Sequence, residues 1–599
     1  MTPEFVTPAL LTVALLLASC DSSRLTTEAE PEAIEASATF AELLDEHFER
    51  SLELRPLFAT QIGDYRYNDR YANSIGPEHR AARRDLNGEF LARLIEIDRD
   101  ALSRQDRLSY DLFKLKRELS LAAERFPTHL APMNQFRSAT SSFVRLGSGS
   151  GQHPFETVKD YDDFLNRIDG FVVYIDQAIE NMQEGMQQGI TQPKVLILKF
   201  LPQIQSQLVD GAEASGFYSP ITNMPEEFSD ADRERLTSAY IDAIENKVLP
   251  TFERLNNFIG DEYLSAARES IGMLDLPSGK EWYAYKVRRI TTTDLTPDEI
   301  HEIGISEIER IHNEMRGVMK AIGFEGDLSE FFEFVYSDPQ FFFDDPEQLI
   351  QAYRDMSADI EGRTSTLFKL FPKTPFEVRR VEPFREQSAA KGSYQRGTPD
   401  GSRPGIFYAN AYNVGIRPKW DMKSLFLHEA IPGHHFQISL AQESEQLPNF
   451  RRFGSYTAYV EGWGLYSEYL GRELGVYEDP MELFGALNAE LWRSIRLVVD
   501  TGIHAKGWTR QQVLDFMYAN SAVSETRAVA EAERFMAIPG QALAYKIGQL
   551  KILEIRADAE ARLGDQFDVR DFHAAVLEDG PMPLSMLEAK IAAWVDEQL

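Results

Sequence analysis

The sequence predicts a mainly α-helical protein of two lobes, with one small β element just before its most histidine-rich segment. Apolar residues recur at spacings of three and four in residues 40–48, 161–186, 236–258 and 300–322, which is the pattern of amphipathic helices. Strand-like segments are sparse. The chain has 599 residues, 43% of them hydrophobic, which is enough to bury several cores.

No internal repeat and no obvious linker divides the helical region. We place an N-terminal helical lobe at residues 38–290 and a C-terminal lobe, which carries the chemistry, at residues 291–599. A strong helix start lies at residues 296–299, where a threonine, a proline and two acidic residues follow one another. These residue types cap a helix and match its first turn.

The β element is predicted at residues 405–414, whose aromatic and β-branched side chains stand between Gly- and Pro-rich flanks. We interpret it as a short hairpin or an edge strand. Tyr408 and Asn410 within it are candidate substrate-binding residues, because a free strand edge can pair with an extended peptide.

The N-terminus predicts export and lipid anchoring. Residues 9–18 form an apolar run of signal-peptide length that is too short to span a bilayer. The run leads into Leu-Ala-Ser-Cys20, which resembles the bacterial lipobox, and Cys20 is the sole cysteine. We therefore expect residues 1–19 to be a lipoprotein signal peptide and Cys20 to carry the lipid.

Lipidation predicts a place in the cell. Acyl chains on Cys20 would anchor the protein to a membrane of the bacterial cell envelope, on the periplasmic side. Asp21 directly after the cysteine favours the inner membrane, as in some Gram-negative lipoproteins. Residues 20–37 are rich in Ser, Thr, Glu and Ala, which is typical of a flexible tether.

Charge excludes one class of partner. Acidic residues outnumber basic ones by 95 to 62, which gives a net charge of −33. A field of that sign repels phosphate backbones, so we expect no nucleic-acid partner. Beyond that, we interpret the excess of acidic residues as a solvated surface that aids solubility.

One short segment carries the donor groups of a metal site. Three of the eleven histidines lie within the eight residues 428–435, and Glu429 follows His428. In zinc peptidases two helical histidines bind the metal, and the adjoining glutamate acts as general base on a water that zinc activates. Apolar residues flank the segment, and buried imidazoles need partners or a metal. The sequence therefore predicts one Zn²⁺ per chain, with Glu429 as the catalytic base.

The spacing of the histidines departs from the usual pattern of i and i+4. His434 follows His428 by six residues, which is about 120° around a straight helix, and His435 lies about 10.5 Å along its axis. Pro432 and Gly433 permit a bulge, because proline breaks the hydrogen-bond ladder and glycine tolerates unusual dihedral angles. A bulge of two residues would place His434 in the ligand position and one of three would place His435. We prefer His434 and keep His435 as the alternative.

A third ligand is expected from a downstream segment. Glu461 follows His434 by 27 residues, which is room for one helix, a loop and entry into the next. We predict Glu461 as the ligand and Glu468 as a supporting carboxylate or an alternative ligand. The glycines at 462 and 464 would allow a close helix approach to the metal.

Three motifs carry a family resemblance. HEAIPGHHFQ at residues 428–437, EGWGLYSE at 461–468 and PGQALAY at 539–545 resemble the family known as domain of unknown function 885. That family is similar to gluzincin-like metallopeptidases, whose ligands are two His and a Glu. Their helical members, the carboxypeptidase Taq and angiotensin-converting-enzyme families, also place Gly before the second His. The resemblance covers most of the mature chain and implies a zincin-like helical fold.

The resemblance also implies a function, a membrane-anchored zinc peptidase with exopeptidase or oligopeptidase activity on peptide substrates. Tyr545 lies in the third motif and is the first candidate to stabilise the oxyanion, and His504 is the second. Arg534 is a candidate to hold a substrate carboxylate, as are Arg527 and Arg496. Three alternatives stay open: a metal-dependent hydrolase of a non-peptide amide or ester, a catalytically inactive binding lipoprotein, and a scaffold without metal.

Overall fold

The computed structural model describes residues 31–382, 386 and 389–599, with side chains from residue 35 onward. The predicted signal peptide, Cys20 and Asp21 lie outside the described residues. Within them the protein is mainly helical and contains one small three-stranded sheet, as the sequence predicts.

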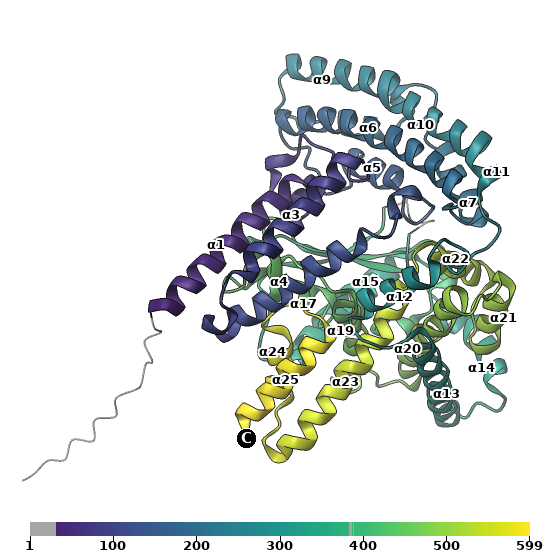
Figure 1. Ribbon diagram of the computed structural model, residues 1–599. Coiled ribbons are helices and arrows are strands. Elements are labelled where there is room, and N and C mark those ends of the chain that lie inside the picture. Colours follow the sequence, from purple (N-terminus) through teal and green to yellow (C-terminus); the bar gives the residue numbers. More distant parts are fainter. Residues whose placement is uncertain (1–30, 383–385, 387–388) are drawn as a thin grey trace, which may run out of the picture.

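The first helices run along one side of the molecule (Figure 1). Helix α1 begins at Pro31, inside the stretch 20–37 that was predicted as a tether. The apolar face predicted for this helix is confirmed, since Phe40, Leu44 and Phe48 are buried. The helices of this group are α1 (Pro31–Glu53), α2 (Pro56–Ile62), α3 (Pro77–Ile95) and α4 (Arg104–Ala123).

The next helices share a hydrophobic core of their own. The longest, α6, starts at a capping box in which the side chains of Thr157 and Asp160 accept bonds from backbone N–H groups. It ends at Gly189, which adopts the left-handed conformation that glycine tolerates. The group comprises α5 (Ala139–Gly147), α6 (Val158–Gln188), α7 (Lys194–Gln205), α8 (Ser219–Thr222), α9 (Asp230–Ala243), α10 (Leu249–Asn257) and α11 (Leu264–Ala266).

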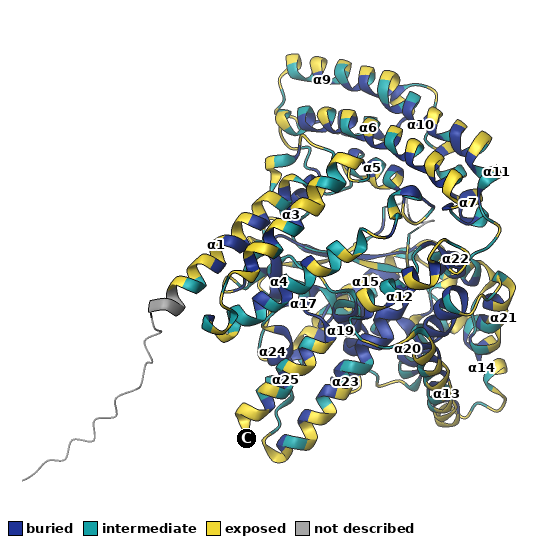
Figure 2. Cartoon of the chain, in the orientation of Figure 1, coloured by how far each residue is buried: buried dark blue, intermediate teal, exposed yellow. Residues whose placement is uncertain are grey.

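The remaining helices pack around α19 and α20, which are buried along most of their length (Figure 2). Helix α13 lies along α20, and α23 lies along α19. The helices are α12 (Gly279–Thr291), α13 (Pro297–Ile322), α14 (Leu328–Ser337), α15 (Pro346–Arg363), α16 (Met422–Glu429), α17 (His434–Glu443), α18 (Asn449–Arg452), α19 (Thr457–Leu470), α20 (Pro480–Ala505), α21 (Arg510–Asn520), α22 (Glu525–Ala537), α23 (Ala544–Leu563), α24 (Val569–Leu577) and α25 (Leu584–Gln598).

The sheet consists of β1 (Phe376–Arg380), β2 (Gly392–Gln395) and β3 (Gly405–Ala409) in the order β1-β3-β2. Strand β3 pairs in parallel with β1 and antiparallel with β2. The prediction of a strand just before the histidine segment is confirmed. Residues 405–414 form neither a hairpin of their own nor an edge strand, because β3 ends at Ala409 and lies between β1 and β2. Both edges of β3 are occupied by neighbouring strands, so no extended peptide can pair with it.

The hydrophobic clusters do not follow the predicted lobe boundary between residues 290 and 291, which falls at the end of α12. Residues of α1–α4 share one cluster with α15–α19 and α23–α25, whereas residues 133–267 form another. Helices α13 and α14 pack instead with α20–α22. The division into lobes at residues 38–290 and 291–599 stays a prediction. Among the described residues, no helix is both long and apolar enough to cross a membrane.

Candidate metal centre

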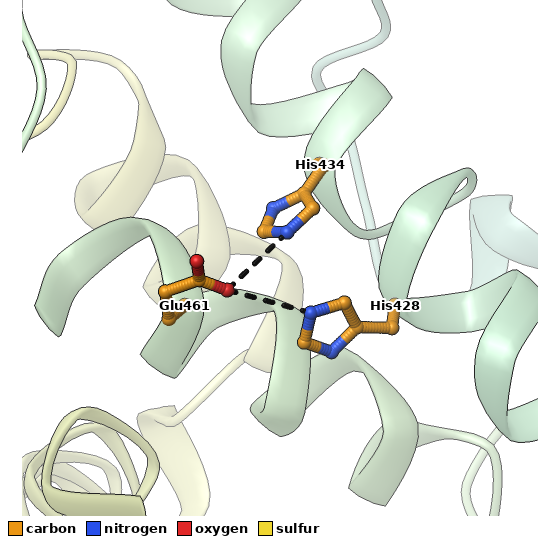
Figure 3. Close-up of side chains that lie close together, drawn as sticks. All are labelled: His428, His434 and Glu461. Carbon is orange, nitrogen blue, oxygen red and sulfur yellow. Dashed lines mark ion pairs between the residues drawn. The ribbon is translucent and has the colours of Figure 1, made fainter. Parts of the chain in front are cut away.

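Three helices bring two imidazoles and a carboxylate together. His428 lies near the end of α16, His434 begins α17, and Glu461 lies in α19. The Nε2 atoms of His428 and His434 lie 3.6 and 3.5 Å from the same Oε2 atom of Glu461 (Figure 3). Donor atoms of the three side chains all lie within 4.8 Å of one another. They are the three residues that the sequence analysis preferred as ligands.

The chain between the two histidines turns sharply. Helix α16 ends at Glu429 and α17 starts at His434, so the expected bulge is a complete break between two helices. The indole N–H of Trp463 donates to the carbonyl of Pro432 at 2.8 Å and ties the turn to α19. A Cβ at Gly433 would meet the carbonyl oxygen of His428 at 2.0 Å, so only glycine fits there.

His428 is held from behind by a buried carboxylate. Its Nδ1 atom donates to Oε1 of Glu468 at 2.8 Å. The same Oε1 lies 3.2 Å from the guanidinium of Arg493, and the hydroxyl of Ser424 donates to Oε2. On its other side the imidazole packs directly against Gly464, where an added Cβ would lie 2.7 Å from the ring. These contacts fix the ring with Nε2 toward Glu461.

The site has a strongly negative potential. Burial lowers the pKa of His428, but the carboxylates of Glu461 and Glu468 outweigh burial and raise it to about 9. Burial likewise raises the pKa of Glu461, and its two histidine neighbours outweigh that effect and lower it below its usual range. Such a cluster attracts positive charge.

His435 does not join the cluster formed by His428, His434 and Glu461. Its Nδ1 atom lies 3.0 Å from the hydroxyl of Tyr394 in β2, and its ring packs against Phe376 in β1. Burial lowers the pKa of His435 to about 4, so it is a neutral imidazole that joins α17 to the sheet. Of the two alternatives left open by the sequence, only His434 lies with His428 and Glu461.

Tyr545 lies beside the cluster, at the start of α23. Its ring stacks on that of His428 with centroids 6.1 Å apart. Its hydroxyl accepts hydrogen bonds from Gln541 at 3.1 Å and from Arg534 at 3.4 Å. Burial and the charge of Glu461 raise the pKa of Tyr545, so its hydroxyl stays protonated at neutral pH.

Several arginines lie around Tyr545. The guanidinium groups of Arg496 and Arg493 lie 4.9 and 5.8 Å from the centre of its ring. Arg496 forms an ion pair of 2.8 Å with Glu531, to which Arg534 also donates at 3.4 Å. Arg527 lies over the ring of Trp492. The sequence analysis did not single out Arg493 or Gln541. Nothing in the local pattern of α20 marks Arg493 as a neighbour of the histidines.

Three predicted site residues serve the fold instead. His504 is fully buried, its Nε2 atom donates to the carbonyl of Phe535 and its Nδ1 atom accepts from the N–H of Met273. It therefore has no nitrogen left for a substrate. The amide of Asn410 donates to two backbone carbonyls and accepts from a third residue's N–H. Tyr408 is buried in the central strand β3.

Glu429, the predicted base, is the last residue of α16 and is half-buried. With the other described residues it forms no hydrogen bond and no ion pair.

The fold and the site define a class: a large helical protein with a partly buried centre of two histidines and one glutamate. The chain belongs to the family described as bacterial protein of unknown function (DUF885), whose model matches residues 56–591. No curated protein matches this chain.

Two solved structures are similar. One is a candidate lipoprotein from Colwellia psychrerythraea, with 29% sequence identity and a TM-score of 0.88 over 94% of this chain and 99% of the other. The second is a candidate lipoprotein of unknown function from Shewanella oneidensis, with 17% identity and a TM-score of 0.72 over 92% of this chain and 99% of the other. The second likeness concerns the fold alone.

Proposed function

We propose that the protein is a zinc-dependent hydrolase of peptides with a zincin-like centre, in which His428, His434 and Glu461 hold the metal. One observation carries the proposal. Both Nε2 atoms lie 3.5–3.6 Å from one carboxylate oxygen, which is longer than the roughly 2.7–3.2 Å of an N–H···O hydrogen bond. Ligands bound at about 2.0–2.1 Å to a tetrahedral zinc ion lie about 3.3–3.4 Å apart.

The donor set supports zinc in particular. Two neutral imidazoles and one carboxylate are the ligands of catalytic zinc sites that keep a fourth position open. The Nδ1–H group of His428 donates to Glu468, and such a carboxylate behind a ligand histidine fixes its tautomer and orientation. The Nδ1 atom of His434 is buried without a partner among the described residues.

Each residue then has a role in hydrolysis. Zinc would supply a Lewis acid that activates water and polarises the scissile carbonyl. Glu429 takes the proton from the water and later delivers it to the leaving amine. The protonated hydroxyl of Tyr545 donates to the oxyanion, and the neighbouring Arg534 keeps that hydroxyl oriented.

The same proposal includes the lipid anchor. Cys20 in its lipobox-like sequence would tether the enzyme to the cell envelope, on the periplasmic side. Support comes from the similar structure from Colwellia psychrerythraea, which is described as a candidate lipoprotein. Labelling with a fatty-acid analogue in a bacterial host, followed by Cys20→Ser, tests it, and label on the serine variant would contradict it.

Metal analysis and one substitution test the hydrolase. The purified protein is expected to contain about one zinc per chain, and Glu429→Gln is expected to keep the metal and lose hydrolysis of peptides. Glu445→Gln, which changes an exposed carboxylate close in sequence, is the matched control and retains both. Normal peptide cleavage by the Glu429 variant refutes the assigned base. Cleavage of esters or cell-wall amides but not peptides would favour the non-peptide hydrolase.

A further inference from the structure

Five basic side chains gather without acidic partners in a protein whose net charge is −33. We call them the basic cluster: Arg55, Lys116, Arg137, Lys286 and Arg289. Lys116 lies in α4 and both Lys286 and Arg289 lie in α12, whereas Arg55 and Arg137 stand just before α2 and α5. Among the residues that the structure describes, none of the five forms an ion pair with a carboxylate.

The basic cluster lies at the protein surface. Arg55, Arg137 and Arg289 are exposed to solvent, and the two lysines are half-buried. Even so, desolvation by the surrounding protein lowers the pKa of Arg55 and Arg137. Desolvation together with repulsion from neighbouring cations, Arg289 among them, lowers the pKa of both lysines to about 7. The cluster is therefore open to solvent, and its cations repel one another.

A contact between distant segments joins two helices of the cluster. The hydroxyl of Tyr285 in α12 donates to the carbonyl of Leu119 in α4 at 2.9 Å, which sets Arg289 and Lys116 on facing helices. The side chains of Lys116 and Arg289 therefore stay close in spite of their mutual repulsion.

The basic cluster adjoins the helices of the metal centre. Helix α12 packs against α19, α20 and α23, which carry Glu461, Arg493 and Tyr545 (Figure 1). A Cβ built on Gly540 would lie 3.7 Å from Lys286, and the next residue, Gln541, donates to the hydroxyl of Tyr545. The cluster and the site thus border the same short segment, residues 540–545.

Unpaired cations held close together cost free energy unless an anion offsets their repulsion. The overall charge of −33 repels large polyanions at long range, so only a short ligand gains from binding to the basic cluster. We propose that the basic cluster binds acidic side chains of the peptide whose scissile bond lies at the His428 centre. This inference rests on the proposed peptidase function and adds its substrate class, short acidic peptides.

Binding and cleavage are measured with three peptides that share length and scissile bond and carry Glu, Gln or Lys at the flanking positions. Binding is followed by calorimetry on the full-length Glu429→Gln protein, which is not expected to cleave them. The Glu peptide is expected to bind at least about fivefold more tightly than the Gln peptide, with the Lys peptide weakest. Arg289→Gln should reduce this preference about fivefold. Arg288→Gln, an exposed neighbour that pairs with Asp294, should leave it unchanged.

The outcomes separate the two proposals. Equal binding of the Glu and Gln peptides overturns the role of the basic cluster, whether or not the wild-type protein cleaves them. A preference for Glu that depends on Arg289, with no cleavage of any peptide by the zinc-loaded wild-type protein, supports the cluster and refutes the peptidase. Cleavage of all three peptides with the same KM supports the peptidase and refutes the cluster.

Discussion

Replacing Gly464 with alanine adds one methyl group, and we expect that group to displace the metal ligand His428. A Cβ at this position would lie 2.7 Å from Cε1 of His428 and 2.9 Å from both ring nitrogens. An ordinary contact begins at 3.4 Å, so Gly464→Ala must move the ring by about 0.7 Å or more. A shift of that size would strain the hydrogen bond from the ring to Glu468, and it exceeds the tolerance of about 0.2 Å in metal–ligand distances.

The expected loss is roughly 10–100-fold in zinc affinity, the range seen when a group that orients a ligand histidine is altered. Alanine favours the helix over glycine by about 1 kcal/mol, so α19 itself should not be weakened. Competition against a chromophoric chelator measures the affinity, and circular dichroism checks the fold.

Gly317→Ala provides the matched control. Gly317 also lies inside a helix, α13, but a Cβ there meets nothing within 4 Å. The control should bind zinc as tightly as the wild type. Wild-type zinc affinity in Gly464→Ala would refute the assignment of His428 as a ligand in the observed orientation.

Two further predictions follow from buried side chains. Glu468→Gln removes the charge behind His428 and should weaken zinc binding by about 10-fold or more; the same chelator competition measures it, and unchanged affinity would contradict the supporting role. His573 is fully buried, donates to the Leu367 carbonyl and accepts from the Tyr466 hydroxyl, and burial lowers its pKa from 6.5 to about 3. Because the unfolded chain binds this proton first, the associated stability is complete above about pH 6.5 and falls as the pH drops toward 3, by about 2 kcal/mol at pH 5. Denaturant titrations at pH 7 and pH 5 measure the free energy of unfolding. Between these pH values the wild type should lose about 2 kcal/mol more of it than His573→Gln does. Equal losses in the two proteins would disprove that His573 is buried in its neutral form.

Much of the helical fold could be predicted because its signals are local. Spacings of three and four fix which face of a helix is apolar, and the buried face of α1 follows from them alone. The capping residues before Pro297 mark a helix start in the same way, and α13 begins there. The donor types of the site were also visible, since His428 and Glu429 adjoin in an apolar segment and His434 and Glu461 stand in motifs.

The sequence alone determined the helical class and the chemical identity of the donor groups, because both depend on residues near one another along the chain. Only the tertiary structure decided which donors meet. Packing made β3 a central strand, turned His435 toward Tyr394, and gave both nitrogens of His504 to the backbone. It also gathered the basic cluster from four separate segments. Contacts between distant segments depend on how the helices pack. They cannot be predicted from the spacing of residues within one segment.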